Sequence, residues 1–215
     1  PIRGGDESFE YPETWSPHYP RTKALAESSV LEVDDPGGGG LRTVALRPHL
    51  VWGPGDPHIV PRVLQRAREG KLKIVGDGSN RVDLTHVRNV AHAHVLALEA
   101  LRQGKGGGRP FFISDGKPVL LWEWIHALLR KCEAPPVEKQ VSLETARRVG
   151  AALESVYRLL RIRREPPMTR FVAQQLGEDH WFNIDAAREV LGYAPPVGND
   201  AGVEELVAYC RDHGV

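Results

Sequence analysis

The stretch TVALRPHLVWGPGDPHIVPRVL, residues 43–64, decides the fold class, because an apolar run in it gives way to a helical pattern through a tight turn. Residues 41–53 are apolar and rich in strand-forming side chains, and GPGDP closes them, which predicts one buried strand. A helix is expected over residues 58–70, with Gly70 at its C-terminal end. Its apolar face comprises Ile59, Val63, Leu64 and Ala67. Strand, turn and helix in this order are typical of an α/β fold.

On both sides of this stretch, helices alternate with short strands. Residues 1–15 are polar and rich in glycine and proline, which predicts a loop, and Ser16 and Pro17 fit the start of a helix that runs to residue 33. Short strands are expected within residues 71–78, 81–87 and 111–116. Further helices are expected over residues 89–101, 121–132, 141–160, 169–176, 184–191 and 202–213. The helix-rich second half suggests a substrate lobe added to a parallel-sheet domain.

The composition excludes several classes of function. The 28 basic and 28 acidic residues cancel, so no overall field attracts nucleic acid or an anionic membrane. No apolar run is long enough to span a bilayer. Cys132 and Cys210 are far apart in the sequence and favour a reducing cytoplasm over a disulfide. His86, His92 and His94 lack zinc-ligand spacing, so we expect no metal site.

One pair of residues has the spacing and chemistry of a proton-transfer site. Tyr19 and Lys23 are four residues apart on one predicted helix and therefore share a face. An ammonium group beside a phenol favours the phenolate and lowers the pKa of the phenol. Such a phenol can give a proton to a carbonyl oxygen or take one from an alcohol. The alternative is a surface helix with a tyrosine packed at its edge.

Three segments in order carry a specific resemblance: HYPRTKALAE (residues 18–27), residues 43–64, and GDGSNRVDLTHVRNVAHAHVLALEAL (residues 76–101). Together they resemble the extended short-chain dehydrogenases/reductases, in the branch of the 3β-hydroxysteroid dehydrogenases. The resemblance implies an NAD- or NADP-dependent enzyme with a Rossmann-type doubly wound parallel sheet and a mostly helical substrate lobe. Which of the two nucleotides it takes stays open.

The resemblance also implies roles for individual residues. Tyr19 is expected to be the catalytic proton donor or acceptor, and Lys23 to lower its pKa and to bind the nicotinamide ribose. Pro48, Leu50 and Val51 are expected to contact the cofactor, because the matching segment passes beside the nicotinamide in the family.

Three further residues are candidates for the substrate side, each with a plainer alternative. Trp52 and His58 follow the expected cofactor contacts, and for Trp52 simple core packing is the alternative. Arg170 could pair with a substrate carboxylate, or it could form an ordinary surface salt bridge. Asp83 matches a family aspartate whose expected task is to hold the substrate lobe against the cofactor domain, and Asn89 fits a helix N-cap.

Two family features are missing from the sequence. No glycine-rich turn follows a strand to hold the pyrophosphate, because the glycines at 37–40 and 106–108 lie in loops. The family's catalytic serine or threonine, upstream of the tyrosine, is also missing. We therefore expect the N-terminal half of the enzyme to be absent. Residues 1–55 would be the remainder of the dinucleotide-binding domain, and residues 56–215 the substrate-binding lobe with some returning Rossmann elements.

The C-terminal stretch narrows the choice of substrate class. Residues 153–193, with PPMTRF and HWF, resemble the bacterial 2-alkyl-3-oxoalkanoate reductases of olefin biosynthesis, which implies a small hydrophobic, lipid-like substrate. A 3β-hydroxysteroid or sterol dehydrogenase is the alternative, and a nucleotide-sugar epimerase or dehydratase, for which Arg81 could bind a diphosphate, is the next. A relative that only binds a nucleotide and regulates is a rival from another class.

The long helix expected over residues 141–160 has an apolar stripe of its own. Val149, Val156 and Leu160 recur at helical spacing, together with Leu153 and Tyr157. A core-facing stripe is the plain interpretation, and a substrate channel or contact with a membrane surface is the other. We expect a cytoplasmic protein without a transmembrane segment and without a nucleic-acid partner. Association with a membrane and formation of a homodimer stay open.

Overall fold

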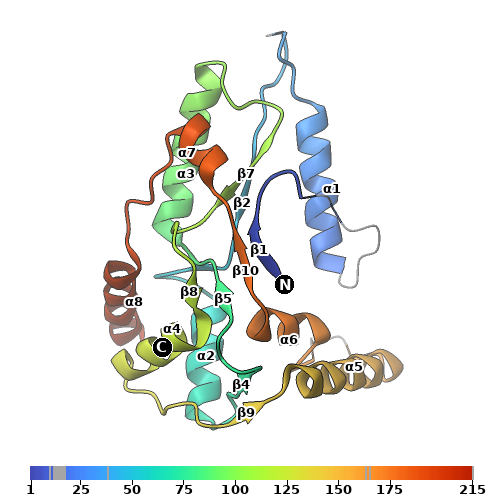
Figure 1. The fold of residues 1–215 in the computed structure, drawn as a ribbon, viewed down its shortest axis with the longest axis vertical. Helices are drawn as coiled ribbons and strands as arrows, with labels where there is room; N and C mark the ends of the chain where they lie inside the picture. Colours follow the sequence, from blue (N-terminus) through green and yellow to red (C-terminus); the bar gives the residue numbers. More distant parts are fainter. Residues whose placement is uncertain (10, 12–17, 38, 163, 165, 215) are drawn as a thin grey trace.

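The computed structural model describes residues 1–9, 11, 18–37, 39–162, 164 and 166–214, and at residues 18–20 it describes the backbone alone. Helices and short strands alternate along these residues (Figure 1). The helices are α1 (His18–Glu32), α2 (Ile59–Arg68), α3 (Val87–Arg102), α4 (Leu121–Lys131), α5 (Leu143–Leu159), α6 (Arg170–Gly177), α7 (Asp185–Leu191) and α8 (Asn199–His213). The strands are β1 (Ile2–Gly5), β2 (Ala45–Pro48), β3 (Val51–Trp52), β4 (Ile74–Val75), β5 (Arg81–Val82), β6 (Thr85–His86), β7 (Pro110–Ile113), β8 (Val119–Leu120), β9 (Gln140–Val141) and β10 (His180–Phe182).

Most strand pairs are parallel and join distant parts of the chain. β2 pairs with β7, from Ala45 opposite Pro110 to Pro48 opposite Ile113. A four-stranded sheet has the order β1-β10-β5-β8, in which β5 and β8 are antiparallel, and the pairs β3–β6 and β4–β9 are parallel. Parallel pairs require long crossover connections, which here contain helices. The predicted α/β class with a Rossmann-like parallel core is confirmed.

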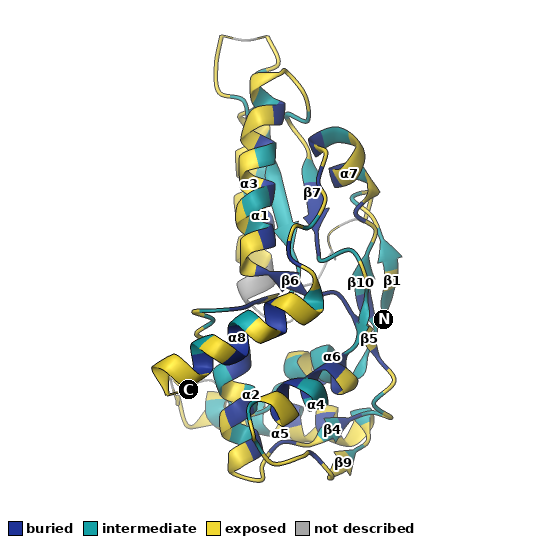
Figure 2. Cartoon of the chain, turned by 90° about the vertical axis from the view of Figure 1, so that its left-hand side faces the viewer, coloured by how far each residue is buried: buried dark blue, intermediate teal, exposed yellow. Residues whose placement is uncertain are grey.

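Two buried apolar clusters hold these elements together, and Figure 2 shows one in the half that contains α3, β7 and α7 and one in the half that contains α2 and α4. The first cluster includes Ala97, Phe111, Ile113, Leu191 and Tyr193. The second includes Trp52, Leu64, Trp122, Leu128 and Leu206. Leu46 of β2 packs on the first cluster and Trp52 of β3 belongs to the second, so the segment between these strands lies where the halves meet.

The predicted single strand over residues 41–53 is wrong. The chain forms two strands instead, β2 and β3, which pair with different partners. Leu50 lies between them with a φ of 42°, in the left-handed region that a non-glycine residue rarely adopts. This residue breaks the ladder, so the chain leaves β7 after His49 and turns towards β6. An apolar run does not reveal such a break, because both of its halves are strand-forming.

Residues 1–15 were expected to form a loop, and this is wrong for Ile2–Gly5, which form β1 and pair in parallel with β10. A four-residue edge strand with two glycines has no apolar alternation that would predict it. The predicted helix of residues 58–70 is confirmed as α2, with Leu64 and Ala67 buried. The predicted helix start at Ser16 lies outside the described residues.

Asn89 is not an N-cap, because α3 begins at Val87 with His86 as its cap residue. The Asn89 side chain is buried and makes two hydrogen bonds with the backbone of Val197, one accepted from its N–H at 2.9 Å and one donated to its carbonyl at 2.8 Å. Asn89 therefore ties the start of α3 to the segment before α8. None of the described helices combines the length and the apolar character needed to cross a bilayer.

Candidate active site

A bidentate ion pair holds α1 against β2. Glu27, on α1, accepts hydrogen bonds from Arg47 Nη2 at 2.6 Å and from Arg47 Nε at 2.9 Å. The Tyr11 hydroxyl donates to Glu27 and accepts from Arg47. The Arg47 and Glu27 side chains are only 17% and 13% exposed. Burial on its own raises the pKa of Glu27, but the hydrogen bonds from Arg47 and Tyr11 hold it below its usual value.

Lys23 lies one helical turn before Glu27 and therefore on the same face of α1. Because Glu27 contacts the residue that precedes Pro48, this face is the one that looks towards β2. The Lys23 side chain is exposed. Tyr19 belongs to the first turn of α1, but its side chain lies outside the described residues. The Tyr19–Lys23 pair therefore stays a prediction.

The segment that follows β2 is clamped by one threonine. The Thr85 hydroxyl donates to the His49 carbonyl at 2.6 Å and lies 3.1 Å from the Ile113 carbonyl. The His49 N–H lies 3.2 Å from Thr85 Oγ1, and the Thr85 N–H donates to the Leu50 carbonyl at 3.2 Å. Thr85 is fully buried. A single side chain thus fixes the backbone at the C-terminal ends of β2 and β7.

The clamped segment presents an apolar surface. Pro48 and Leu50 are half-buried, and Val51 is 38% exposed. These are the three residues expected to contact the cofactor, and they lie together at the carboxyl end of a parallel strand. Ligands of open parallel sheets bind at such ends.

A histidine pair, which the sequence did not single out, lies beside this segment. His49 Nε2 and His180 Nδ1 are 2.6 Å apart, and His180 Nε2 lies 2.8 Å from the Gln175 carbonyl. Since a carbonyl only accepts, His180 carries its proton on Nε2, and His49 Nε2 donates to His180 Nδ1. Burial, with a smaller effect of His180, lowers the pKa of His49 to about 3. Both rings are therefore neutral near pH 7.

Asp83 joins β5 to β10 close to this pair. Its side chain is 1% exposed and accepts a hydrogen bond from the Phe182 N–H at 2.7 Å. Its own N–H donates to the His180 carbonyl at 3.2 Å. Burial raises the pKa of Asp83 to about 6, and the charge of Asp115 adds to the effect. The carboxylate is thus a structural link between two strands rather than a solvent-facing group.

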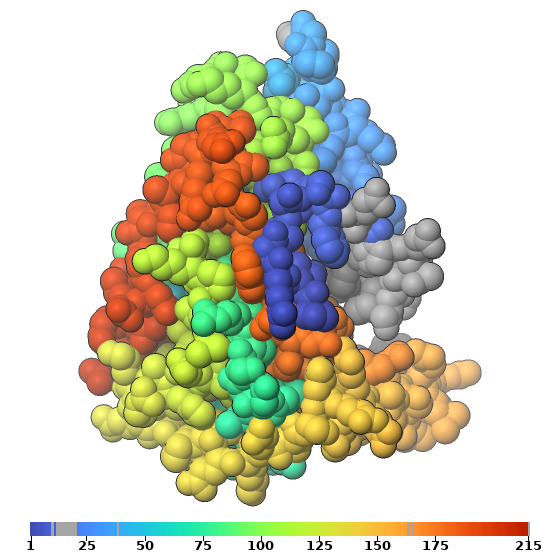
Figure 3. Space-filling model, viewed as in Figure 1, coloured from blue at the N-terminus to red at the C-terminus, as the bar shows by residue number. Residues whose placement is uncertain are grey.

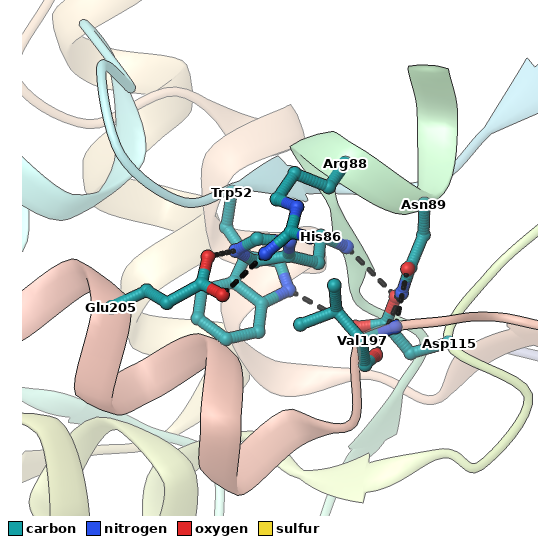
Figure 4. Close-up of polar contacts among 7 residues, drawn as sticks. All are labelled: Trp52, His86, Arg88, Asn89, Asp115, Val197 and Glu205. Carbon is teal, nitrogen blue, oxygen red and sulfur yellow. Dashed lines mark hydrogen bonds and ion pairs between the residues drawn. The ribbon is translucent and has the colours of Figure 1, made fainter. Parts of the chain in front are cut away.

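Trp52 belongs to a buried polar network (Figure 4). It is 1% exposed, and its Nε1 donates to Asp115 Oδ2 at 3.2 Å. Asp115 Oδ1 accepts from Asn89 Nδ2 at 2.7 Å and from the His86 N–H at 2.8 Å. The His86 ring is fully buried without a hydrogen-bond partner among the described residues, 3.8 Å from Glu205 Oε2. The geometry favours the packing alternative for Trp52 over contact with a substrate.

The other two substrate candidates lie on the surface. His58 is exposed and precedes α2, whose first N–H groups are capped by Asp56 Oδ2 at 3.1 Å and 2.8 Å. Arg170, at the start of α6, pairs with Glu154 on α5 at 2.9 Å. Its geometry favours the salt-bridge alternative. Among the described residues, neither His58 nor Arg170 forms a hydrogen bond or ion pair with the clamped segment of residues 48–51.

Neither cysteine is in a disulfide, although both line one cavity of about 340 Å³. Burial raises the pKa of both thiols. Within the described ranges, no three His, Cys, Asp or Glu side chains are grouped closely enough to hold a metal ion. The network around Asp115 and the histidine pair are the features that the sequence did not predict. His49 and His180 are 131 positions apart, and no local pattern connects them.

The chain is similar to known proteins over almost its whole length. The chain is 47% identical to 2-alkyl-3-oxoalkanoate reductase of Stenotrophomonas maltophilia over 210 residues, which are 97% of this chain and 63% of the relative. It is 44% identical to the reductase of the same name from Shewanella oneidensis, over 95% of this chain and 54% of the relative. The chain therefore spans between half and two thirds of the length of these relatives.

The fold and the family follow from two further likenesses. The structure of MoeE5 in complex with UDP-glucose and NAD superposes with a TM-score of 0.67 at 23% identity, over 100% of this chain and 62% of that one, which shows a shared fold. The sequence profile of the 3-beta hydroxysteroid dehydrogenase/isomerase family matches residues 1–144. The match covers about two thirds of the chain and includes α1, the clamped segment and Asp83. The chain belongs to the 3-beta hydroxysteroid dehydrogenase/isomerase family.

Proposed function

We propose that this chain is part of an NAD(P)-dependent oxidoreductase that reduces a ketone, or oxidises a secondary alcohol, on a lipid-like substrate. A 2-alkyl-3-oxoalkanoate is the substrate that fits best, because the two reductases that share 47% and 44% of their residues with this chain carry that name. The alternative within the family is a 3β-hydroxysteroid or sterol dehydrogenase.

One observation carries the proposal. The Glu27–Arg47 ion pair holds α1 beside β2, and Lys23 lies on the face of α1 that Glu27 uses. The apolar segment of residues 48–51 follows Arg47 directly and is clamped at the strand end. The cationic side chain of Lys23 suits the ribose of a nicotinamide nucleoside, and the apolar strand end on the adjoining element suits its ring.

The residues present fit one end of a dinucleotide. Val51 is 38% exposed beside half-buried Leu50, so an apolar ring can pack there without displacing the core. The other end has no counterpart in this sequence, because no glycine-rich turn follows a strand to hold a pyrophosphate. We assign Lys23, Pro48, Leu50 and Val51 to the nicotinamide end, together with Tyr19.

In the proposed reaction this chain supplies the proton and the surface that excludes water. NAD(P)H, when bound, supplies the hydride to the carbonyl carbon. Tyr19 gives its hydroxyl proton to the substrate oxygen as negative charge develops there. The Lys23 ammonium stabilises the phenolate that remains. Leu50 and Val51 keep water from the reacting face, which strengthens these charge interactions.

The nucleotide-sugar alternative finds less support in the charges around its candidate residue. Arg81, which could bind a diphosphate, lines a cavity of about 400 Å³ together with Lys131, Glu123 and Asp200. The two carboxylates offset the two cations, and Lys131 also pairs with Glu204, so the cavity offers a diphosphate no excess of positive charge. The fold shared with MoeE5, at 23% identity, does not bear on the substrate.

A panel of substrates tests the proposal in the full-length protein. Oxidation of NADPH and NADH is measured with a 2-alkyl-3-oxoalkanoate, a 3-ketosteroid and a UDP-sugar at matched concentrations. We expect the 2-alkyl-3-oxoalkanoate to give the highest kcat/KM. A higher value for the 3-ketosteroid would favour the sterol alternative, and turnover of the UDP-sugar alone would refute the proposal.

Three further assignments are proposed with it. Residues 1–55 complete the cofactor domain, and residues 56–215 form the substrate lobe with returning Rossmann elements. Formation of a homodimer is the second assignment, and sedimentation of the full-length protein tests it. Cytoplasmic location with association at a membrane is the third assignment.

A further inference from the structure

Two cysteines that are far apart in the sequence meet where α4 and α8 pack together. Cys132 caps the C-terminal end of α4 and is half-buried, whereas Cys210 lies in the last turns of α8 and is 5% exposed. Both thiols are free, and both line one cavity of about 340 Å³. Their side chains are in hydrogen-bonding contact. The fold thus brings two thiols to one cavity, and neither has a role in the proposed reaction.

The packing of α8 against α4 holds the two thiols together. Cys210 belongs to the same buried cluster as Leu128 of α4 and Leu206 of α8, and Cys132 packs against that cluster. Figure 1 shows α8 ending beside α4, and Figure 3 shows the red C-terminal segment against the yellow segment at the lower left of the molecule. The meeting of the two side chains therefore depends on two packed helices and not on a loop.

Cations surround the cavity because the C-terminal ends of three helices meet there. Arg68 ends α2, Lys131 ends α4, and Arg211 lies in the last turn of α8. Basic residues in a last turn offset the negative end of the helix dipole. Lys131 also pairs with Glu204. These cations are thus accounted for by the helix ends, and the thiols are the reactive groups of the cavity.

The two thiols differ in their readiness to react. Burial raises the pKa of both, and the charge of Arg68 acts on both in the opposite direction. The hydrogen bond from Cys132 also lowers the pKa of Cys210, as a donated hydrogen bond does for the group that accepts it. The thiolate is the form that attacks an oxidant. Cys210 is therefore the first nucleophile of the pair, and Cys132 lies within reach of the product.

We propose that Cys132 and Cys210 form a reversible dithiol–disulfide site that reacts with hydrogen peroxide. The Cys210 thiolate attacks one peroxide oxygen and the O–O bond breaks, which leaves a sulfenic acid and a hydroxide that takes a proton to become water. The Cys132 thiol then attacks the sulfenic sulfur, so the S–S bond forms and a second water leaves. Two electrons pass from the thiols to the peroxide, and the products are one disulfide and two waters.

The disulfide would connect the end of α4 to α8 across a long intervening stretch of chain. Such a bond restricts the unfolded chain and should stabilise the folded protein. In a reducing compartment a disulfide of this kind forms transiently, during oxidation. The modification goes beyond the proposed reductase activity, because neither cysteine is among the residues assigned to the nicotinamide end.

Peptide mapping of the full-length protein without reduction tests the site. The folded protein is treated with hydrogen peroxide, the remaining thiols are alkylated, and the digest is analysed by mass spectrometry. We expect two peptides joined through Cys132 and Cys210, which dithiothreitol returns to free thiols. The crosslink should form at the same rate when the protein is diluted, because both thiols belong to one chain. Oxidation should also raise the Tm by about 5 °C or more.

Two variants separate the thiol pair from other effects of the oxidant. Cys132→Ala, at a half-buried helix end, should fold but lose both the crosslink and the rise in Tm. Its Cys210 should stop at the sulfenic acid, which dimedone traps. The matched control is Glu133→Gln, which changes a residue of the same cavity and keeps both thiols. This control should crosslink as wild type does.

Three results would overturn the proposal. The first is recovery of both cysteines as alkylated thiols after treatment of the folded wild type with peroxide. The second is a crosslink between Cys132 and Cys210 that appears only in urea-unfolded protein. The third is a rise in Tm of Cys132→Ala as large as that of wild type. Each result leaves the substrate panel for the reductase unaffected, so the two proposals fail separately.

Discussion

Replacing Asp83 with asparagine should change how the stability of the protein depends on pH. Asp83 is buried and accepts a hydrogen bond from the Phe182 N–H at 2.7 Å. An asparagine oxygen can accept the same hydrogen bond but has no proton to exchange in this range. Asp83→Asn thus removes the titration and keeps the link between β5 and β10.

The direction and the size of this change in stability follow from the pKa of Asp83. Burial raises the pKa of Asp83 from 3.8 to about 6, so between these values the folded state keeps a proton that the unfolded state has released. The contribution to stability is fully present below pH 3.8 and is lost as the pH rises through about 6. A shift of about two pKa units corresponds to about 3 kcal/mol.

Urea unfolding of wild type and Asp83→Asn at a series of pH values measures this effect. From about pH 4 to about pH 7 the variant should gain about 3 kcal/mol relative to wild type. Asp212→Asn, at an exposed position on α8, is the control and should follow the wild-type curve. If the curves of wild type and Asp83→Asn stay parallel over this range, the burial argument for Asp83 is refuted.

Three more predictions concern the site. Tyr19→Phe should leave NAD(P)H binding nearly intact and reduce turnover by ~10²-fold or more, because the general acid is lost. Steady-state rates of the full-length protein measure this effect. Unchanged turnover would contradict the assignment of Tyr19. Glu27→Ala leaves Arg47 partly buried without a carboxylate partner and should cost about 2 kcal/mol in urea unfolding. Glu144→Ala, which breaks an exposed pair, should cost less than about 0.5 kcal/mol. Equal costs would refute the anchoring of α1. His180→Leu leaves the donor of its histidine partner without an acceptor and should cost about 1–3 kcal/mol. His180→Asn should recover part of that loss, and equal stability of the two variants would argue against the hydrogen bond.

Local patterns predicted the helices well. The face of α2 follows from Leu64 and Ala67 at helical spacing. In the structure Ser142 and Thr169 cap α5 and α6, and their side chains accept hydrogen bonds from residues three positions on. These features depend on neighbours within one or two helical turns, which the sequence displays directly.

Patterns over a few residues could not reveal features that depend on distant partners. The break at Leu50 exists because β2 and β3 pair with strands far along the chain. Trp52 has the same apolar neighbours in sequence whether it packs or binds a substrate, and the contact with Asp115 that favours packing comes from a residue 63 positions away. The α5 stripe with Val156 and Leu160 has the period of a buried face, yet it is open because small residues on another face meet α6.

The sequence by itself determined the family, the α/β class and the candidate pair Tyr19 and Lys23, because motif order and helical spacing are properties of the chain alone. Only the tertiary structure decided that His49 meets His180 and that Arg47 holds α1 on β2 through Glu27. Such contacts form between segments that are joined by long crossovers, and their energies depend on burial. Burial is a property of the packed molecule, and no local stretch of residues specifies it.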